Sequence, residues 1–283
     1  MIRTIGVVGA GVMGNGIAHV FAWHGYDVIL YDSDDSQLAK AMVTIRENLG
    51  RQAKKGLVDS SRIDEITGRI KTSLYLSDLA PVDFVVEAVT ENKPLKVELF
   101  RKLDEIVQED VIMASNTSSI PITTIAAATR RPGQVIGMHF MNPAPVMPLV
   151  EVIRGQATSD ATFAATAKLV ASLEKEIALA QDYPGFIVNR ILIPMINEAI
   201  FALFEGVATA EDIDKGMKLG TNQPIGPLAL ADLIGLDTVL AIANVLYEGF
   251  KDQKYRPCPL LVKMVAAGIL GRKTGQGFYA YQE

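Results

Sequence analysis

The first thirty-two residues alternate short apolar runs with one amphipathic stretch. Residues 4–8 (TIGVV) and 28–31 (VILY) are apolar and rich in β-branched side chains, which is typical of buried strands. Between them, residues 12–23 repeat apolar side chains at helical spacing, with Ile17 and Phe21 on the same side. The pattern therefore predicts a strand, a helix and a second strand that ends on an acidic residue.

The same alternation continues to about residue 183. Further strands are expected at 70–74, 82–88, 111–115, 135–138, 149–153 and 176–180, and helices at 34–56, 58–69, 93–107 and 159–174. A doubly wound sheet needs only a short crossover after its second strand. The helices at 34–56 and 58–69 therefore predict a helical insertion.

The pattern changes after residue 183, where only helical spacing remains. Helices are expected at 186–204, 209–219, 228–233, 237–250 and 259–267. The first is apolar nearly all round, which predicts burial in a core or an interface, and its Asn189, Arg190 and Glu198 argue against a membrane span. We expect an α/β Rossmann-like doubly wound sheet in residues 1–183 and an all-α domain for substrate binding and dimerisation in residues 184–283.

Composition supports two cores and excludes several partners. The chain has 283 residues, 49% of them hydrophobic and 21% charged, with a net charge of −5. Neither a nucleic-acid groove nor binding to an anionic membrane is expected. Cys258 is the single cysteine, which excludes an internal disulfide and, with the immediate entry into a strand, predicts a cytoplasmic protein. We expect no metal site.

Three glycines join the first strand to the first helix. Gly9 permits the tight turn, Gly11 lets the backbone approach a pyrophosphate, and Gly14 lets the helix lie close to the strand. The N–H groups at the helix start favour phosphate charge. Val12 and Met13 complete this loop, and we expect both to contact a dinucleotide.

Asp32 ends the second strand, close to the spacing of about 20 residues at which a ribose-binding acid is expected. Its carboxylate would accept hydrogen bonds from both ribose hydroxyls and repel a 2′-phosphate. The following residues, 33–35, supply no arginine for such a phosphate. The sequence therefore favours NAD over NADP.

Polar residues follow several predicted strands. Residues 90–92 and 116–119 lie where the carboxyl ends of parallel strands meet and ligands bind, and Ser118 is expected to point into this crevice. His139 follows the strand at 135–138. Glu151 lies inside the apolar run PLVEVI and needs a partner if it is buried, so we pair it with His139. The alternative is a strand whose Glu151 side faces water.

These segments together resemble one family. GAGVMGNGIA, VVEAVTEN, SNTSSIPI, GMHFMNPAPVMPLVEVI, DYPGFIVNRI and GRKTGQGFY match the short-chain L-3-hydroxyacyl-CoA dehydrogenases, most closely the bacterial members that act on 3-hydroxybutyryl-CoA. The resemblance covers the whole chain. It implies the NAD-dependent interconversion of (S)-3-hydroxyacyl-CoA and 3-oxoacyl-CoA. The long apolar helix expected at 186–204 suggests a homodimer formed through the second domain.

The resemblance also implies residue roles. His139 would be the catalytic base, Glu151 would orient it, and Ser118 and Asn189 would contact the substrate. The cofactor contacts implied are Asp32, Glu91, Lys96, Ser118, Asn142 and Lys273, and the coenzyme A contacts are Asn48 and Lys55.

One departure and two alternatives remain. Asn222 stands where relatives often carry a histidine, which puts only details of the second domain in doubt. A sugar-acid dehydrogenase acting on L-gulonate would share the His–Glu pair, whereas Lys54 and Lys55 favour a phosphate-bearing coenzyme A tail. A non-catalytic NAD-binding protein would not need the set of Ser118, His139, Glu151 and Asn189.

Overall fold

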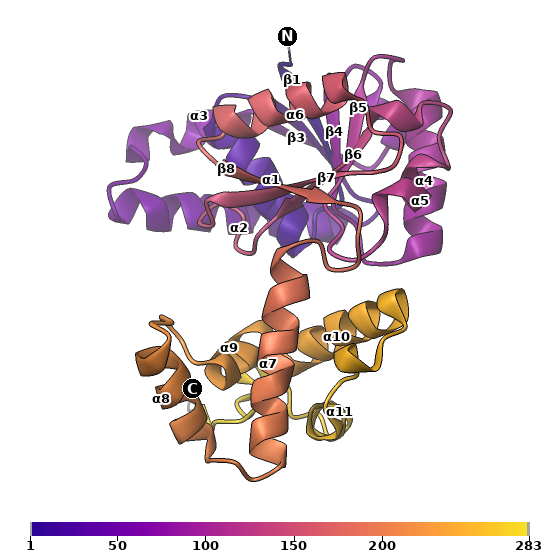
Figure 1. Cartoon of the computed structure of the whole chain (residues 1–283). Helices are drawn as coiled ribbons and strands as arrows, with labels where there is room; N and C mark the ends of the chain where they lie inside the picture. The colour runs from indigo at the N-terminus through magenta and orange to yellow at the C-terminus, as the bar shows by residue number, and fades with distance from the viewer. Residues whose placement is uncertain (1, 282–283) are drawn as a thin grey trace. The chain divides into compact units, whose positions relative to one another are not determined.

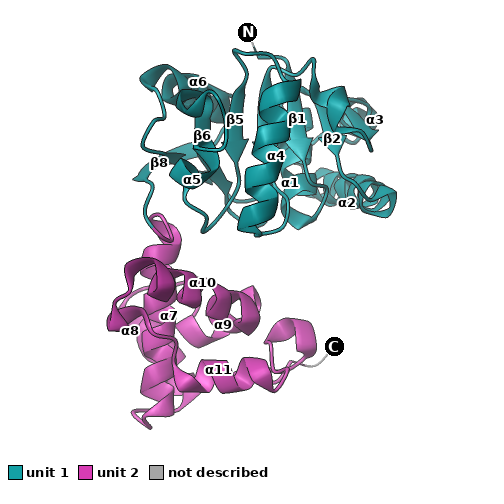
Figure 2. Cartoon of the chain, turned by 90° about the vertical axis from the view of Figure 1, so that its right-hand side faces the viewer, with its two compact units in different colours: residues 1–183 teal, residues 184–283 magenta. Residues whose placement is uncertain are grey.

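The computed structural model describes residues 2–281, which form two compact units. The boundary falls between Tyr183 and Pro184 (Figure 2). The first unit is a sheet covered by helices, and the second is helical (Figure 1). The predicted fold class is therefore confirmed.

Eight strands form a single sheet in the order β3-β2-β1-β4-β5-β6-β7-β8. They are β1 (Thr4–Val8), β2 (Asp27–Tyr31), β3 (Ile70–Ser73), β4 (Phe84–Glu87), β5 (Ile112–Ser115), β6 (Val135–Phe140), β7 (Leu149–Arg154) and β8 (Glu176–Gln181). Neighbouring strands pair parallel except β6 and β7, which pair antiparallel. The order reverses between β1 and β4, which makes this the switch point where an open α/β sheet binds ligands.

Six α-helices belong to this unit within residues 2–183. They are α1 (Val12–Trp23), α2 (Asp35–Lys54), α3 (Ile63–Gly68), α4 (Lys93–Ile106), α5 (Ile122–Ala126) and α6 (Asp160–Ser172), with short 3₁₀ turns η1 (Ser60–Arg62), η2 (Leu76–Leu79) and η3 (Pro132–Gln134). Asp34, Asn92 and Ser159 accept N–H hydrogen bonds at the starts of α2, α4 and α6, so polar caps set where these helices begin.

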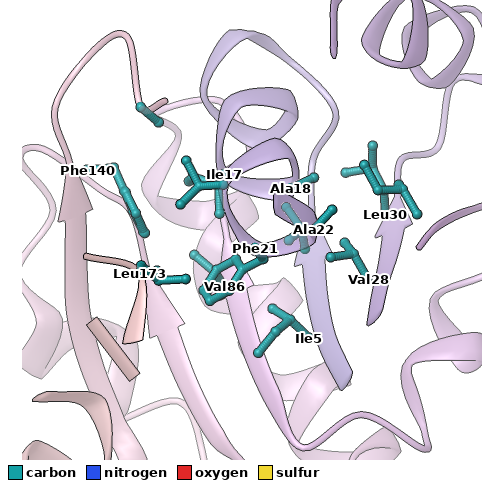
Figure 3. Packing of buried hydrophobic residues seen from close by; sticks show 14 of the residues in the cluster. Ile5, Ile17, Ala18, Phe21, Ala22, Val28, Leu30, Val86, Phe140 and Leu173 are labelled. Carbon is teal, nitrogen blue, oxygen red and sulfur yellow. The ribbon is translucent and has the colours of Figure 1, made fainter. Parts of the chain in front are cut away.

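The helix α1 packs on the middle of the sheet. Ile17 and Phe21 are fully buried and lie among Ile5, Val86 and Phe140 from the strands (Figure 3). The Phe21 and Phe140 rings meet edge to face, with centroids 6.4 Å apart. Each such side chain contributes about 1.5–3 kcal/mol on burial. This packing fixes the helix start against the ends of the strands.

Most expected boundaries differ by one or two residues, and two of these differences change where a residue lies or how an element is divided. β6 continues through Phe140, so His139 lies within the strand and not after it, because His139 and Phe140 pair with Glu151 and Val150 of β7. The helix expected at 58–69 is divided into η1 and α3, with Asp59 capping the first turn. The helical insertion itself, α2 to α3 between β2 and β3, is present as expected.

In the second unit, described from residue 184 to 281, five α-helices surround a separate core. They are α7 (Val188–Phe204), α8 (Ala210–Gly220), α9 (Pro227–Ile234), α10 (Leu236–Phe250) and α11 (Pro259–Ala266), with short 3₁₀ turns η4 (Gln253–Tyr255) and η5 (Arg272–Thr274). α7 buries Ile193, Ile196 and Ile200, whereas Ile191 is 65% exposed. The helix is therefore buried on one face in this unit and not all round.

The C-terminal segment is tied to α9 by a buried carboxylate. Asp232 accepts hydrogen bonds from the N–H groups of Phe278 and Tyr279 and from the Tyr281 hydroxyl. Within residues 2–281 no single helix is both long and apolar enough to cross a membrane. Taken together, α9 and α10 have the length and composition of a span, but the chain bends by 100° at their junction.

A buried histidine joins the helical insertion to the Rossmann unit. His19 of α1 is 0% exposed, and its Nε2 lies 3.1 Å from Oε1 of Gln52 in α2. Because the amide oxygen accepts, Nε2 carries a proton. Burial lowers the pKa of His19 to about 4, so the ring is neutral at pH 7.

This burial predicts a pH-dependent stability. The unfolded chain binds a proton on His19 near pH 6.5 and the folded chain only near pH 4, so the stability that neutral His19 contributes is lost as the pH falls between these values. The loss is on the order of 3 kcal/mol. Unfolding by urea at several pH values should show a flatter profile for His19→Gln than for the unchanged chain and the control His24→Gln. Equal slopes for all three would contradict it.

Candidate active site

The glycine turn between β1 and α1 has the shape that the sequence predicts. Gly9 has a φ of +99°, and a Cβ there would lie 2.8 Å from the carbonyl oxygen of Ala88. A Cβ on Gly14 would lie 1.7 Å from the carbonyl oxygen of Gly9, so only glycine lets α1 start this close to the strand. A Cβ on Gly11 would meet no protein atom within 4 Å. Space for a ligand thus remains in front of Gly11.

The start of α1 is open to an anion. Gly11 is its N-cap and supplies no side-chain hydrogen bond, and the first turn holds no acidic residue. Val12 is 72% exposed beside it, and Met13 is half-buried. These features fit the pyrophosphate of a dinucleotide, whose charge the amide groups and the helix dipole would stabilise.

Asp32 is held at the end of β2 next to this turn. Its Oδ2 accepts a hydrogen bond from the Ala10 N–H at 2.7 Å, and its Oδ1 accepts one from the Asp34 N–H at 3.0 Å. The carboxylate is therefore oriented before any ligand arrives. Each oxygen keeps a lone pair for a ribose hydroxyl, which fits the expected role.

A second carboxylate organises the turn after β5. Oε1 of Glu91 accepts hydrogen bonds from the Thr117 hydroxyl (2.6 Å), the Ser118 N–H (2.8 Å), the Ser118 hydroxyl (3.2 Å) and the Ser119 hydroxyl (2.8 Å). Burial alone would raise the pKa of Glu91. The charge of Lys96 and the hydrogen bonds from Thr117, Ser119 and the Ser118 N–H outweigh burial and lower that pKa. Glu91 is thus ionised at neutral pH and holds the turn as an acceptor.

Lys96, expected to contact the cofactor, lies buried beside two carboxylates. The side chain is 1% exposed, and Nζ lies 2.5 Å from Oε1 of Glu87 and 3.4 Å from Oε2 of Glu91. The ammonium is enclosed by these carboxylates and the carbonyl oxygen of Val89, and a contact between Lys96 and a cofactor stays a prediction.

His139 and Glu151 form a direct pair. They are opposite residues of the antiparallel strands β6 and β7, and His139 Nδ1 lies 2.8 Å from Glu151 Oε2. Glu151 is 0% exposed and His139 is 8% exposed. A buried carboxylate accepts the Nδ1 proton, so the neutral ring carries its basic lone pair on Nε2. This geometry supports the predicted pairing and not the alternative in which Glu151 faces water.

The ends of neighbouring strands are also tied together. Oδ1 of Asn116, directly after β5, accepts the N–H of Phe140 at 2.8 Å, and the Asn116 N–H donates to the carbonyl oxygen of Glu87. The loop after β6 is held by Lys175, whose Nζ donates to the carbonyl oxygens of Ala144 and Met147. These contacts set the end of the strand that carries His139.

The remaining predicted residues are dispersed. Asn48 lies on α2, Lys55 caps that helix, and Asn142 is exposed in the loop after β6. In the second unit, Asn189 lies in the first turn of α7, and Lys273 forms an ion pair with Asp237. Their parts in a site stay predictions.

Sequence reasoning missed two residues of this region, Glu87 and Ser115. Both are buried and, with Thr117 of the predicted polar turn, join the ends of β4 and β5 to the Glu91 turn. Glu87 lies in the apolar run VVEA, which carries the same signal as Glu151 in its own strand. Ser115 has no comparable signal, because its partner Glu87 lies far along the chain.

Comparisons with known proteins agree over the whole chain. Residues 4–183 match the NAD binding domain of 3-hydroxyacyl-CoA dehydrogenase, and residues 185–281 match the C-terminal domain of the same family. The 3-hydroxybutyryl-CoA dehydrogenase of Bradyrhizobium diazoefficiens is 54% identical over 282 residues, covering 100% of this chain and 96% of the relative. The mitochondrial hydroxyacyl-coenzyme A dehydrogenase of Homo sapiens is 43% identical, with 100% and 92% covered.

Solved structures give the same result. The crystal structure of (S)-3-hydroxybutyryl-CoA dehydrogenase from Ralstonia eutropha superimposes with a TM-score of 0.96 at 54% identity, and each chain covers 100% of the other. The match extends through both units.

The position of Asp32 predicts the choice of dinucleotide. Asp32→Ala should weaken NADH binding about tenfold or more and raise the relative use of NADPH, because two hydroxyl acceptors and a charge that repels a 2′-phosphate are lost. Kd values for both cofactors by fluorescence titration check this. Asp35→Ala, which removes a neighbouring exposed charge, should change the ratio of the NADH Kd to the NADPH Kd by no more than about twofold. An unchanged ratio in Asp32→Ala would remove Asp32 from the ribose site.

Proposed function

The chain belongs to the 3-hydroxyacyl-CoA dehydrogenase family, and we propose that it interconverts (S)-3-hydroxybutyryl-CoA and acetoacetyl-CoA with NAD. The observation that carries the chemistry is the His139–Glu151 pair, with 2.8 Å between Nδ1 and Oε2 inside the Rossmann unit. The glycine turn and Asp32 next to it fit the cofactor.

Oxidation of a secondary alcohol removes a hydride from carbon and a proton from oxygen. NAD, when bound, supplies the hydride acceptor. His139 accepts the hydroxyl proton at Nε2, and Glu151 keeps the Nδ1 proton in place and stabilises the imidazolium that forms. In the reverse direction the protonated ring donates to the ketone oxygen.

Ser118 supports the same oxygen in this proposal. Its hydroxyl makes the longest of the four hydrogen bonds to Glu91 Oε1, at 3.2 Å. The hydroxyl can therefore turn to the substrate while three other donors still satisfy the carboxylate. A donor that gains strength as charge develops on oxygen lowers the barrier. Asn189 is proposed as a second donor.

The other binding roles follow from the family pattern. Glu91, Lys96, Asn142 and Lys273 are proposed to contact the cofactor. Asn48 and the exposed ammonium of Lys55, at the end of α2, are proposed to contact the coenzyme A moiety. A cation at a helix end suits the phosphates of coenzyme A.

The substrate assignment is tested directly. Purified protein is given NADH and acetoacetyl-CoA, with NAD and L-gulonate as the comparison, and absorbance at the NADH band is followed. Rapid oxidation of NADH with acetoacetyl-CoA supports the proposal. Turnover of L-gulonate alone would show that the substrate assignment and the role of Lys55 are wrong. The proposed proton transfer by His139 and Glu151 would still apply.

The His–Glu pair predicts separable effects. His139→Gln should lower kcat by about 10² or more with the Kd for NADH within about threefold, because the base is lost and the cofactor site is not. Glu151→Gln should lower kcat much more than it raises KM, because the amide no longer fixes the tautomer. His24→Gln is the matched control and should keep full activity. Equal loss of turnover and NADH binding in His139→Gln would make His139 structural.

We also propose a homodimer formed through residues 184–283, in the cytoplasm. The support is a set of exposed apolar side chains in that unit, Phe204, Val207, Leu219 and Leu233, each at least 47% exposed. Cys258 is a free, buried thiol whose pKa burial raises, which suits a reducing compartment.

The dimer has a simple test. Light scattering at micromolar concentration should give twice the mass of one chain, and Leu219→Asp should shift the population towards monomer because a charge would enter the interface. Val43→Asp, at an exposed apolar position of the first unit, is the control. A monomer of the unchanged chain at that concentration would defeat the proposal.

A further inference from the structure

A charged pair is buried beneath the turn that carries Ser118. Glu87, the last residue of β4, is 0% exposed, and Lys96, one turn into α4, is 1% exposed. Their Oε1 and Nζ atoms lie 2.5 Å apart. The proton-transfer steps above use neither residue.

Glu87 is fully engaged at its buried position. Its Oε1 also accepts the N–H of Val89 at 2.7 Å, and its Oε2 accepts the hydroxyl of Ser115 at 2.6 Å. Removing two charges from water costs free energy that the attraction between them only partly offsets, and apolar residues of similar volume often serve stability as well. The pair is therefore expected to have a role in addition to stability.

The contacts of Lys96 show what that role is. Besides Glu87, Nζ reaches the carbonyl oxygen of Val89 at 3.1 Å and Oε2 of Glu91 at 3.4 Å. Glu91 lies in the loop between β4 and α4, and its side chain is 36% exposed. Lys96 attracts one oxygen of this carboxylate, while the other oxygen faces the 117–119 turn and accepts all four of its hydrogen bonds.

We propose that Glu87 and Lys96 are positioning residues that hold Glu91, and through it Ser118, in the arrangement needed for the reaction. This inference rests on the proposed function, because it takes Ser118 as a group that contacts the reacting oxygen. Glu87 fixes the ammonium of Lys96, the ammonium fixes Oε2 of Glu91, and Oε1 then keeps the turn in place. Without this anchor the exposed Glu91 carboxylate turns to water, and Ser118 must be ordered anew in each catalytic cycle.

The test is a double-mutant cycle with acetoacetyl-CoA and NADH. Glu87→Gln/Lys96→Met removes both charges at nearly constant volume, and the introduced side-chain amide can still bond with Ser115 and Val89. We expect kcat, measured at saturating NADH, to fall by about tenfold or more, because the turn that carries Ser118 is no longer held. Combined with Ser118→Ala, the triple variant should match Ser118→Ala within about twofold, because both changes remove the same contribution.

Two controls separate positioning from stability. Lys102→Met removes a lysine from the same helix, where its ion pair with Glu98 is exposed, and should leave kcat unchanged. Glu91→Gln leaves the buried pair intact but removes the charge that Lys96 attracts, and its cycle with Ser118→Ala should be equally non-additive. This second cycle also serves if the double variant does not fold.

The outcomes are distinct. Losses that multiply in the triple variant, an unchanged kcat in the double variant, or a loss confined to NADH affinity would each overturn the positioning role. Absence of turnover in the unchanged chain would instead defeat the proposed function. In that case amide hydrogen exchange over residues 117–119 still tests the positioning role. The Ser118 N–H should exchange at least about tenfold faster in the double variant than in the unchanged chain. Equal exchange rates would overturn the inference.

Discussion

The carboxyl ends of the central strands lie at one level, and the candidate site depends on this register. Val8 pairs with Tyr31 on one side and with Glu87 on the other, and Glu87 pairs in turn with Ser115. The residues that follow these strands therefore emerge together at the switch point of the sheet. A slip of one residue in any pair would turn every side chain of that strand to the opposite face.

The antiparallel strand pair at one side of this register adds the acid–base group. A fully parallel sheet would send the chain after β6 away through a long crossover. Here β7 returns beside β6 and places Glu151 opposite His139. The cost of burying the carboxylate is offset because it has a hydrogen-bond partner at 2.8 Å. The same contact defines which nitrogen of the ring exchanges protons.

Buried ionisable groups recur in this unit with different consequences. His19 stays neutral in its apolar surroundings and makes stability depend on pH. Glu87 and Lys96 stay paired and connect β4 and β5 to an exposed carboxylate. Glu91 is the point where this buried network reaches the surface turn that holds Ser118. Polar contacts thus connect the buried pair of Glu87 and Lys96 to the turn at 117–119.

The sequence by itself determined the fold class, the family and the cofactor turn, because these depend on local spacing. Gly9 and Gly14 are required by contacts at the turn itself, and Asp32 follows its strand directly. The pairing of His139 with Glu151 was also predicted, since both residues lie on neighbouring segments and one of them is an acid in an apolar run.

Only the tertiary structure decided which partners the other buried polar groups take. Glu87 carried the same signal as Glu151, yet its partner is a lysine on the following helix. Lys96 lies in the interior beside two carboxylates, and Ser118 is held by a carboxylate 27 residues away. Periodicity along the chain records which side of an element is buried. It does not record which buried groups meet, because that depends on strand register and on helices that pack across several strands at once.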